Sequence, residues 1–345
     1  MIEVYRVIPK LGRARSHSRL AWAMRMGALL VSITAVGNAR AAWACPAGPF
    51  GHPVPPGAQI AHLDNALPRD AFNQNGNLNA NVEGPVWLGG SLYVSEFGQG
   101  ANPPPSRVLQ ITGDNTGVVF MATAGTNGLA TDPAGKLYGA SHKVGGIVRF
   151  GAAGEEPTVI VSSYLGQRFN SPNDLTFRSD GTLYFTDPTW QATNPPPQAK
   201  TRVYRVAPGS HKAQVIDANR SQPNGVTLSP DEKTLYLSSL DGLYKYAVAA
   251  DGSVGPPKRF ASQIGGADGM VVDCAGNLYV TSTDVIVLNP AGKEIDRLHM
   301  PAGAGSVTNV AFGGAKRKTL FITAMGQGSG RGVFKVDLKV PGMPY

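Results

Sequence analysis

The stretch Asn173-Asp174-Leu175, followed by Ser179-Asp180-Gly181 and Leu183-Tyr184-Phe185, decides the fold because its pattern recurs along the chain. Each copy has a polar residue, apolar residues, a turn rich in Asp, Ser or Gly, and then an apolar run that starts with Leu. Short apolar runs bounded by such turn residues predict antiparallel strands. The copies are 40 to 51 residues apart and begin at Glu83, Asn127, Asn173, Asn224, Asp268 and Thr308.

A repeat of this length built from short strands is typical of a β-propeller. Each unit has room for four strands of about five residues. The sixth unit supplies only three, so we expect residues 59–63 to add the fourth and close the ring. An open solenoid is the alternative, and its two ends would need caps. The prediction is an all-β, six-bladed β-propeller with four-stranded antiparallel blades around a central channel, formed by residues 45–345 as a single domain.

Residues 1–44 resemble an export signal. Arg19 and Arg25 precede the short apolar stretch 26–36, and small residues of the A-x-A type follow at 39–44. We therefore expect residues 1–44 to be a leader and the protein to be periplasmic or secreted. Seven Lys/Arg and one Glu in this segment account for most of the formal net charge of +8. The rest has no basic face for nucleic acid, and no apolar run reaches the ~20 residues of a membrane span.

The chain has two cysteines, Cys45 and Cys274. A disulfide between them would suit an oxidising compartment. Cys45 could instead carry a lipid after cleavage of the leader, or the two could be unrelated thiols. Two cysteines alone cannot form a zinc site.

The first residues of the six repeats predict a metal site. If the ring closes, equivalent positions converge at one mouth of the channel. All six side chains carry oxygen acceptors, and Glu83 and Asp268 add negative charge. Oxygen donors without His or Cys suit Ca²⁺ or a similar hard divalent ion. The alternative is simple turn chemistry, since Asn-Gly and Asp-Gly are common turn pairs.

These motifs resemble the SMP-30/gluconolactonase/LRE-like family of calcium-dependent six-bladed propellers, which includes lactonases. The resemblance covers about residues 58–340. Its motifs here are Glu83-Gly84-Pro85-Val86-Trp87, Ser171-Pro172-Asn173-Asp174-Leu175, Pro223-Asn224-Gly225-Val226 and Ala267-Asp268-Gly269-Met270. It implies that Glu83, Asn173, Asn224 and Asp268 bind the metal. Asn127 and Thr308 would lie in the mouth without being inner ligands.

The chain departs from the family in two places. Ala140-Ser141-His142-Lys143-Val144 keeps the family's His but neither its acidic neighbour nor the residues that follow. Ser239-Leu240-Asp241 replaces a run of small and polar residues in the fourth unit. The first difference concerns the contacts that select a substrate.

A metal at the mouth predicts hydrolysis, because it can stabilise an oxyanion and lower the pKa of bound water. Asp268 is the candidate to take the proton or to attack directly. His142 could orient the substrate or protonate the leaving alkoxide, or it could be a surface or structural histidine. The loops Glu96–Ser106 and Asp187–Arg202 are expected to overhang the site and limit substrate size, with plain surface connectors as the alternative. Trp190 in the second loop could stack on a sugar ring or only pin the loop.

We therefore expect an exported, monomeric hydrolase that opens a small lactone, such as gluconolactone, with Ca²⁺ and with Zn²⁺ or Mg²⁺ as alternatives. A metal-dependent esterase or organophosphate hydrolase on the same site is the first alternative. A non-catalytic ligand-binding propeller with a structural ion is the second.

Overall fold

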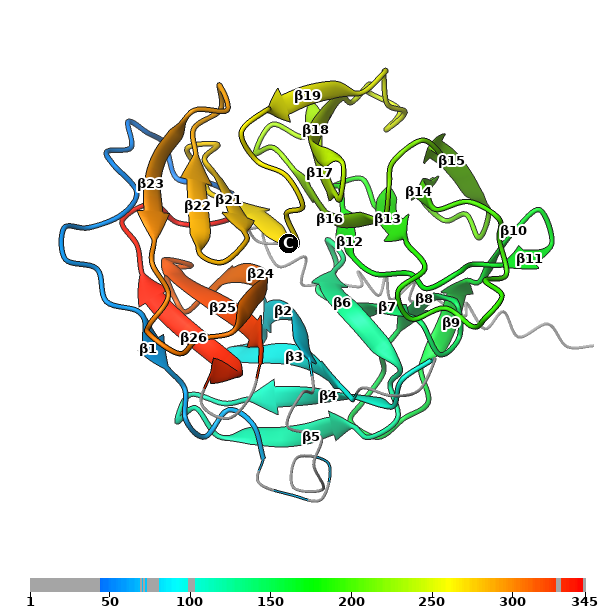
Figure 1. Ribbon diagram of the computed structural model, residues 1–345, viewed down its shortest axis with the longest axis horizontal. Helices are drawn as coiled ribbons and strands as arrows, with labels where there is room; N and C mark the ends of the chain where they lie inside the picture. Colours follow the sequence, from blue (N-terminus) through cyan, green and yellow to red (C-terminus); the bar gives the residue numbers. More distant parts are fainter. Residues whose placement is uncertain are drawn as a thin grey trace, which may run out of the picture. The chain divides into compact units, whose positions relative to one another are not determined.

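The computed structural model describes residues 44–68, 70, 72, 81–98, 103–326 and 330–343. The predicted leader lies almost entirely outside them. Within this part of the chain, six four-stranded antiparallel sheets follow one another around a common centre (Figure 1). The predicted six-bladed propeller is thus confirmed. No helix among these residues is long and apolar enough to cross a membrane.

The strands follow the predicted repeats. Blade 1 consists of β2 (Asn81–Leu88), β3 (Ser91–Phe97), β4 (Ser106–Ile111) and β5 (Gly117–Met121). Blade 2 consists of β6 (Thr126–Thr131), β7 (Leu137–Ser141), β8 (Gly146–Arg149) and β9 (Thr158–Val161). Blade 3 consists of β12 (Leu175–Phe177), β13 (Leu183–Asp187), β14 (Arg202–Val206) and β15 (Ala213–Asp217). A small hairpin, β10 (Ser163–Tyr164) with β11 (Gln167–Arg168), joins blades 2 and 3.

The second half repeats the arrangement. Blade 4 consists of β16 (Pro223–Leu228), β17 (Thr234–Ser239), β18 (Gly242–Ala247) and β19 (Lys258–Ala261). Blade 5 consists of β20 (Met270–Val272), β21 (Leu278–Thr281), β22 (Val285–Leu288) and β23 (Glu294–Leu298). Blade 6 consists of β24 (Ser306–Gly313), β25 (Thr319–Met325), β26 (Gly332–Asp337) and the N-terminal β1 (Ala61–His62).

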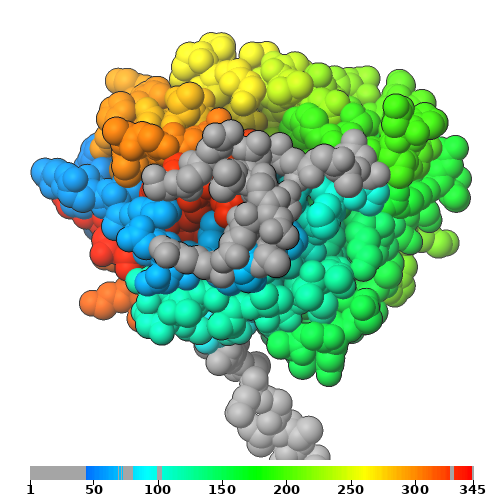
Figure 2. Space-filling model, turned by 60° about the horizontal axis from the view of Figure 1, so that its bottom comes forward, coloured from blue at the N-terminus to red at the C-terminus, as the bar shows by residue number. Residues whose placement is uncertain are grey.

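The ring is closed in two ways. Each first strand contacts the first strands of both neighbouring blades, and β24 of the last blade contacts β2 of the first. At the outer edge of the last blade, β1 pairs antiparallel with β26, through Ala61 opposite Lys335 and His62 opposite Phe334. The blades also follow one another in chain order around the surface in the space-filling view (Figure 2).

The core consists of six apolar clusters, and each lies between two adjacent blades. In the cluster between blades 5 and 6, for example, Tyr279 packs edge-on against Phe312 with ring centroids 5.2 Å apart. Burial of these side chains is the main force that holds neighbouring blades together. The Leu-Tyr motif is therefore a structural signal, because it supplies the second strand's contribution to these interfaces.

Cys45 and Cys274 form a disulfide, with their Cα atoms 5.4 Å apart. Cys274 lies in the β20–β21 turn, at the opposite end of β20 from Asp268, and its backbone N–H donates to the carbonyl of Pro341. The disulfide and the C-terminal residues therefore fix the face of blade 5 that lies away from the predicted mouth. Of the three possibilities left open for Cys45, the structure has the disulfide.

Candidate metal centre and active site

The first residue of each repeat lies at an irregular point of its blade. In blades 1, 2, 4 and 6 a register shift interrupts the pairing of the first two strands there. In blades 3 and 5 the first strand begins two residues later, at Leu175 and Met270. Such irregularities change the direction of a side chain relative to the sheet. They explain why these side chains line the channel mouth instead of a sheet face.

Glycines let the blades approach closely at the mouth. A Cβ on Gly84 would lie 2.5 Å from the carbonyl oxygen of Asn127, and one on Gly225 would lie 2.6 Å from that of Asp268. Gly84 also has a φ of +56°, which disfavours other residues. The Gly of the Glu83-Gly84 and Asn224-Gly225 pairs is thus needed for contact between neighbouring blades.

A set of hydroxyl groups that the sequence analysis did not single out holds the mouth residues from the neighbouring blade. Thr186 Oγ1 donates to the carbonyl of Asn224 (2.7 Å), Ser238 Oγ to that of Asp268 (2.6 Å) and Thr281 Oγ1 to that of Thr308 (3.1 Å). A sequence signal exists, because a hydroxyl residue follows the Leu-Tyr-x or Leu-Phe-x triplet in five of the six repeats. These residues are Ser95, Thr186, Ser238, Thr281 and Thr323.

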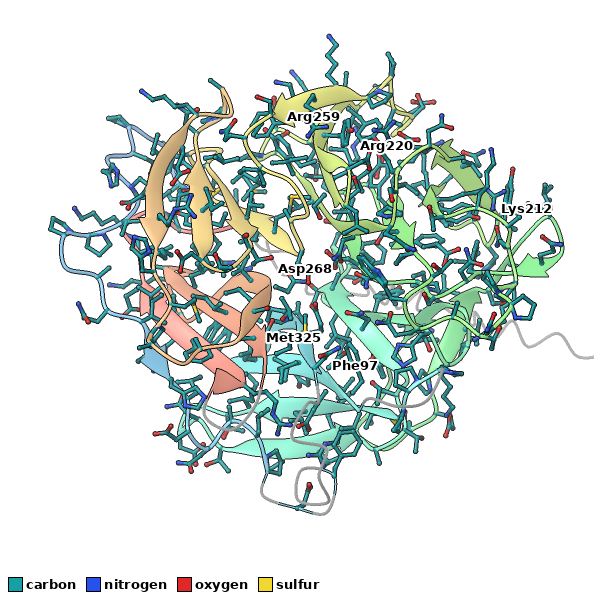
Figure 3. The ribbon with its side chains drawn as sticks, in the orientation of Figure 1. Phe97, Lys212, Arg220, Arg259, Asp268 and Met325 are labelled. Carbon is teal, nitrogen blue, oxygen red and sulfur yellow. A yellow bond between two sulfur atoms is a disulfide. The ribbon has the colours of Figure 1, made fainter. Side chains whose placement is uncertain are left out.

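The six predicted mouth residues all line one cavity of about 330 Å³. Asp268 is partly exposed and the other five are buried. Asp268 lies near the centre of the ring, with Met325 and Phe97 beside it (Figure 3). The structure therefore brings Glu83, Asn127, Asn173, Asn224, Asp268 and Thr308 together, as the repeat phase predicts.

The carboxylates at the mouth are removed from water and lie close to other carboxylates. Burial raises the pKa of Glu83 well above its ordinary range, and the neighbouring Asp268 raises it further. Burial likewise raises the pKa of Asp268 to about 8, with a further contribution from Asp174, although a hydrogen bond from the Asn224 side chain opposes the shift. Repulsion between like charges in a buried site thus favours binding of protons or of another cation.

Asp174 is a further buried acid that sequence reasoning did not assign. Its carboxylate accepts the N–H groups of Leu175 (2.9 Å) and Val226 (3.1 Å), so it links blade 3 to blade 4 beneath the mouth. Burial raises its pKa to about 7 in spite of these two bonds. It takes the position that Gly84 and Gly225 have in their repeats, which is why it looks like turn chemistry in the sequence.

The donor set fits a hard divalent cation. Glu83, Asn173, Asn224 and Asp268 offer two carboxylates and two amides, and no Lys, Arg or His is among the described residues that line the cavity. Carboxylate and amide oxygens are preferred ligands of Ca²⁺. Among the residues that the structure describes, no cluster of three His, Cys, Asp or Glu side chains is present that could hold a metal. The candidate set differs from such clusters because half of its donors are neutral.

His142 lies behind the cavity wall and is not among the residues that line it. It is fully buried, its Nε2–H donates to the carbonyl of Pro104 (3.1 Å), and its ring meets Phe97 edge-on at 5.7 Å. Burial lowers its pKa to about 4, so the ring is neutral at pH 7. This position does not support the expected contact of His142 with substrate.

Both predicted loops contribute to the cavity. In the loop after β13, Trp190 and Gln191 line it. At the start of the predicted loop Glu96–Ser106, Phe97 at the end of β3 lines the cavity. The N–H of Gly98 donates to the carbonyl of Pro105 at 2.8 Å, which fixes the base of the loop. Residues 99–102 of that loop lie outside the described part of the chain.

Comparison with known proteins agrees with this geometry. The family profile described as SMP-30/Gluconolactonase/LRE-like region matches residues 82–326. A gluconolactonase from Zymomonas mobilis is 30% identical over 280 residues, which are 70% of this chain and 75% of that protein.

Two solved structures have a similar fold. A gluconolactonase from Xanthomonas campestris superposes with a TM-score of 0.65 at 30% identity, over 85% of this chain and all of that one. A calcium-binding regucalcin from Agrobacterium tumefaciens superposes with a TM-score of 0.64 at 20% identity, over 82% of this chain and 97% of that one. At that identity the second similarity concerns the fold alone.

Proposed function

The chain belongs to the SMP-30/gluconolactonase/LRE-like family, and on this basis we propose that it is an exported, metal-dependent hydrolase that opens a lactone ring. The observation that carries the proposal is the convergence of Glu83, Asn173, Asn224 and Asp268 on one cavity without a neighbouring cationic side chain among the described residues. The names of the gluconolactonases it resembles make gluconolactone the reference substrate.

Glu83, Asn173, Asn224 and Asp268 would hold the ion, with Ca²⁺ as the first candidate and Zn²⁺ or Mg²⁺ as alternatives. When bound, such an ion supplies Lewis-acid stabilisation of negative charge on the lactone carbonyl oxygen and lowers the pKa of bound water. The all-oxygen donor set favours Ca²⁺ over Zn²⁺, which prefers nitrogen and sulfur ligands.

The other steps of the proposed reaction depend on side chains of the protein. Asp268 is the partly exposed carboxylate among the four metal-ligand candidates, so it can accept a proton from the attacking water. Water adds to the carbonyl carbon, the ring C–O bond breaks, and the released alkoxide takes up a proton to give the hydroxy acid. Asn127 is buried in the lining of the same cavity, and its amide oxygen has no partner among the described residues, so it can orient a water or a substrate hydroxyl.

His142 would then be a positioning residue. Its contacts with Phe97 and Pro104 hold the wall of the cavity and the base of the β3–β4 loop. Export is supported by the leader pattern and by the Cys45–Cys274 disulfide, since disulfides persist in oxidising compartments.

The test compares wild type with Asp268→Asn at saturating Ca²⁺ in a pH-indicator assay with δ-gluconolactone, a simple aliphatic lactone, an aryl ester and a phosphotriester. We expect lactone turnover, and a loss of about 10²-fold or more in kcat for Asp268→Asn. Asp64→Asn, an exposed aspartate outside the cavity, is the matched control and should behave as wild type.

Turnover of only the ester or the phosphotriester would replace the lactonase proposal with that activity. Bound Ca²⁺ without turnover of any of the four would favour a binding propeller. Equal turnover in wild type and Asp268→Asn would contradict the role of Asp268.

A further inference from the structure

Four of the six blades contribute an apolar side chain to the cavity, on the outer side of the metal-ligand candidates. Four side chains form this apolar wall: Phe97, Trp190, Leu240 and Met325. Phe97 and Met325 end the second strands of blades 1 and 6, Leu240 directly follows that of blade 4, and Trp190 lies three residues after that of blade 3. Second strands end on the same face as the mouth, so the apolar wall stands above the floor of metal-ligand candidates.

Leu240 is the most informative member of the apolar wall because it is 56% exposed. An exposed leucine alone means little, but one that contributes to a cavity above polar groups offers apolar surface to a ligand. It lies in the segment Ser239-Leu240-Asp241, at the end of the second strand of blade 4.

The backbone around Leu240 is held rigidly from its outer side. Its N–H donates to the carbonyl of Ser221 at 2.9 Å. The Asp241 side chain accepts hydrogen bonds from four groups: Ser221 N (3.0 Å), Ser239 Oγ (2.7 Å), Arg220 Nη1 (2.9 Å) and Tyr244 OH (2.8 Å). Arg220, between β15 and β16, and Arg259, in β19, contact Asp241 and lie away from Asp268 (Figure 3). The leucine is therefore presented by a fixed turn, which lowers the entropic cost of binding against it.

The two aromatic members are fixed in the same manner. Phe97 is buried against the His142 ring. The segment that carries Trp190 is fixed because Thr189 N donates to Gln222 Oε1 (2.9 Å) and Gln222 Nε2 donates to Thr189 Oγ1 (2.8 Å). The apolar wall is thus preorganised on three separate blades.

The described part of the chain contributes few polar groups beside the apolar wall. Asn81 and Gln191 are the amides beside the apolar wall, and none of its described residues is charged. A hydroxyl group of a sugar lactone that lay against Phe97, Trp190, Leu240 or Met325 would find no hydrogen-bonding oxygen on these side chains. Removing a hydroxyl from water without a new partner is unfavourable, whereas burial of hydrocarbon is favourable.

We propose that the apolar wall binds a hydrocarbon substituent of the lactone, so that the preferred substrates are lactones with an alkyl or aryl substituent rather than polyhydroxylated sugar lactones. The proposal rests on the proposed lactonase function and narrows its substrate class. The floor would take the ester group and the apolar wall would take the substituent.

The experiment measures kcat/KM of the full chain at saturating Ca²⁺ for δ-valerolactone, δ-hexalactone, δ-octalactone and δ-gluconolactone, each corrected for spontaneous hydrolysis. The first three differ only in the length of the alkyl substituent. We expect kcat/KM to rise about fourfold per added carbon, because a buried methylene contributes about 0.8 kcal/mol. We also expect δ-octalactone to exceed δ-gluconolactone about tenfold or more.

Leu240→Asn should lower the ratio of kcat/KM for δ-octalactone to that for δ-valerolactone about fivefold or more, and Met325→Gln should lower it in the same direction. Leu165→Asn is the matched control, since Leu165 is an 84% exposed leucine in the β10–β11 turn outside the cavity. It should leave both the ratio and the activity unchanged. Leu240 is exposed, so its replacement should also leave the Tm unchanged.

A flat series, or an unchanged ratio in Leu240→Asn, would overturn this inference and leave the lactonase function intact. A preference for δ-gluconolactone over δ-octalactone would overturn it as well. If no lactone is hydrolysed faster than in buffer, the proposed function fails and the inference fails with it.

Discussion

Glu83 and Asp268 bring negative charge into a site whose other candidate donors are neutral amides. Burial raises the pKa of each carboxyl, and the neighbouring Asp174 raises both further. Without a counter-charge such a pair is costly, since burial disfavours the charged form and like charges repel. The proposed cation supplies that counter-charge, which is the simplest reason for two carboxylates at the mouth.

Glu83→Gln should lower the affinity for Ca²⁺ about tenfold or more, because Ca²⁺ affinity depends on the number of charged ligands. Isothermal titration calorimetry on metal-free protein measures it. Glu294→Gln is the matched control, because Glu294 pairs with Arg297 at a half-exposed site and should leave the affinity unchanged. Equal affinities in wild type and Glu83→Gln would remove Glu83 from the ligand set.

Asp187 gives a pH-dependent prediction. Its carboxylate accepts the N–H groups of Ser171 (2.8 Å) and Asn170 (3.0 Å), just before Asn173, and burial raises its pKa from 3.8 to about 7. The folded state therefore binds more protons at this group than the unfolded state between about pH 4 and 7, so its contribution to stability falls as pH rises through that range.

The free energy of unfolding of wild type, relative to Asp187→Asn, should accordingly decrease between pH 5 and pH 8 at constant saturating Ca²⁺. Urea denaturation at several pH values measures it. Asp337→Asn, in β26, serves as the control. A wild-type advantage over Asp187→Asn that stays constant with pH would show that the carboxylate keeps its ordinary pKa.

At the scale of the elements, the closeness of neighbouring first strands constrains the site. Gly84 and Gly135 both have positive φ, at +56° and +73°. A Cβ on Gly84 would meet the Asn127 carbonyl at 2.5 Å, whereas one on Gly135 would have no atom within 4 Å. The two glycines therefore separate the cost of the backbone conformation from that of blade contact.

Gly135→Ala should lower the free energy of unfolding by about 1–2 kcal/mol, the ordinary cost of a left-handed conformation. Gly84→Ala should cost clearly more and should also weaken Ca²⁺ binding, because the β2–β6 contact must open. Chemical denaturation and calorimetry measure the two effects. A similar cost for both variants would mean that blade contact at the mouth is loose.

Some features of the fold and of the site could be predicted from the sequence, and others could not. The Leu-Tyr strands and Asp-Gly turns are local signals, so the blades could be predicted from them. Glu83 and Asp268 have the same position in their repeats, and this alone predicts that they come together at the mouth. His142 could not be placed, because its burial depends on Phe97 and Pro104, which come from another blade. The hydroxyl groups typified by Ser238 were overlooked because their partners, such as the Asp268 carbonyl, are on the next blade.

At the scale of the whole molecule, covalent and non-covalent contacts stabilise the closed ring. The Cys45–Cys274 disulfide joins residues 229 positions apart. Such a crosslink restricts the unfolded chain, and a typical gain is about 2–4 kcal/mol. Its location on the face of blade 5 away from Asp268 separates its effect on stability from catalysis.

Cys45→Ser together with Cys274→Ser should therefore lower the Tm of the protein and leave kcat/KM unchanged well below that temperature. Differential scanning calorimetry with and without reductant measures the first effect, and reductant should change only wild type. An identical Tm in wild type and the double variant would show that the disulfide is not formed in the protein. If the protein is exported, we expect to find it in the periplasm or the medium, with a mature N-terminus near Cys45.

The central claim is that the six repeats converge to build one metal-dependent hydrolytic site. Titration of Ca²⁺ into metal-stripped protein, with calorimetry and lactone hydrolysis followed in the same sample, tests it most directly. The structure predicts that turnover, absent in the stripped protein, rises in proportion to occupancy of a site that Asp268→Asn weakens. Full turnover by metal-free protein, or Ca²⁺ binding at full affinity in Asp268→Asn, would contradict it.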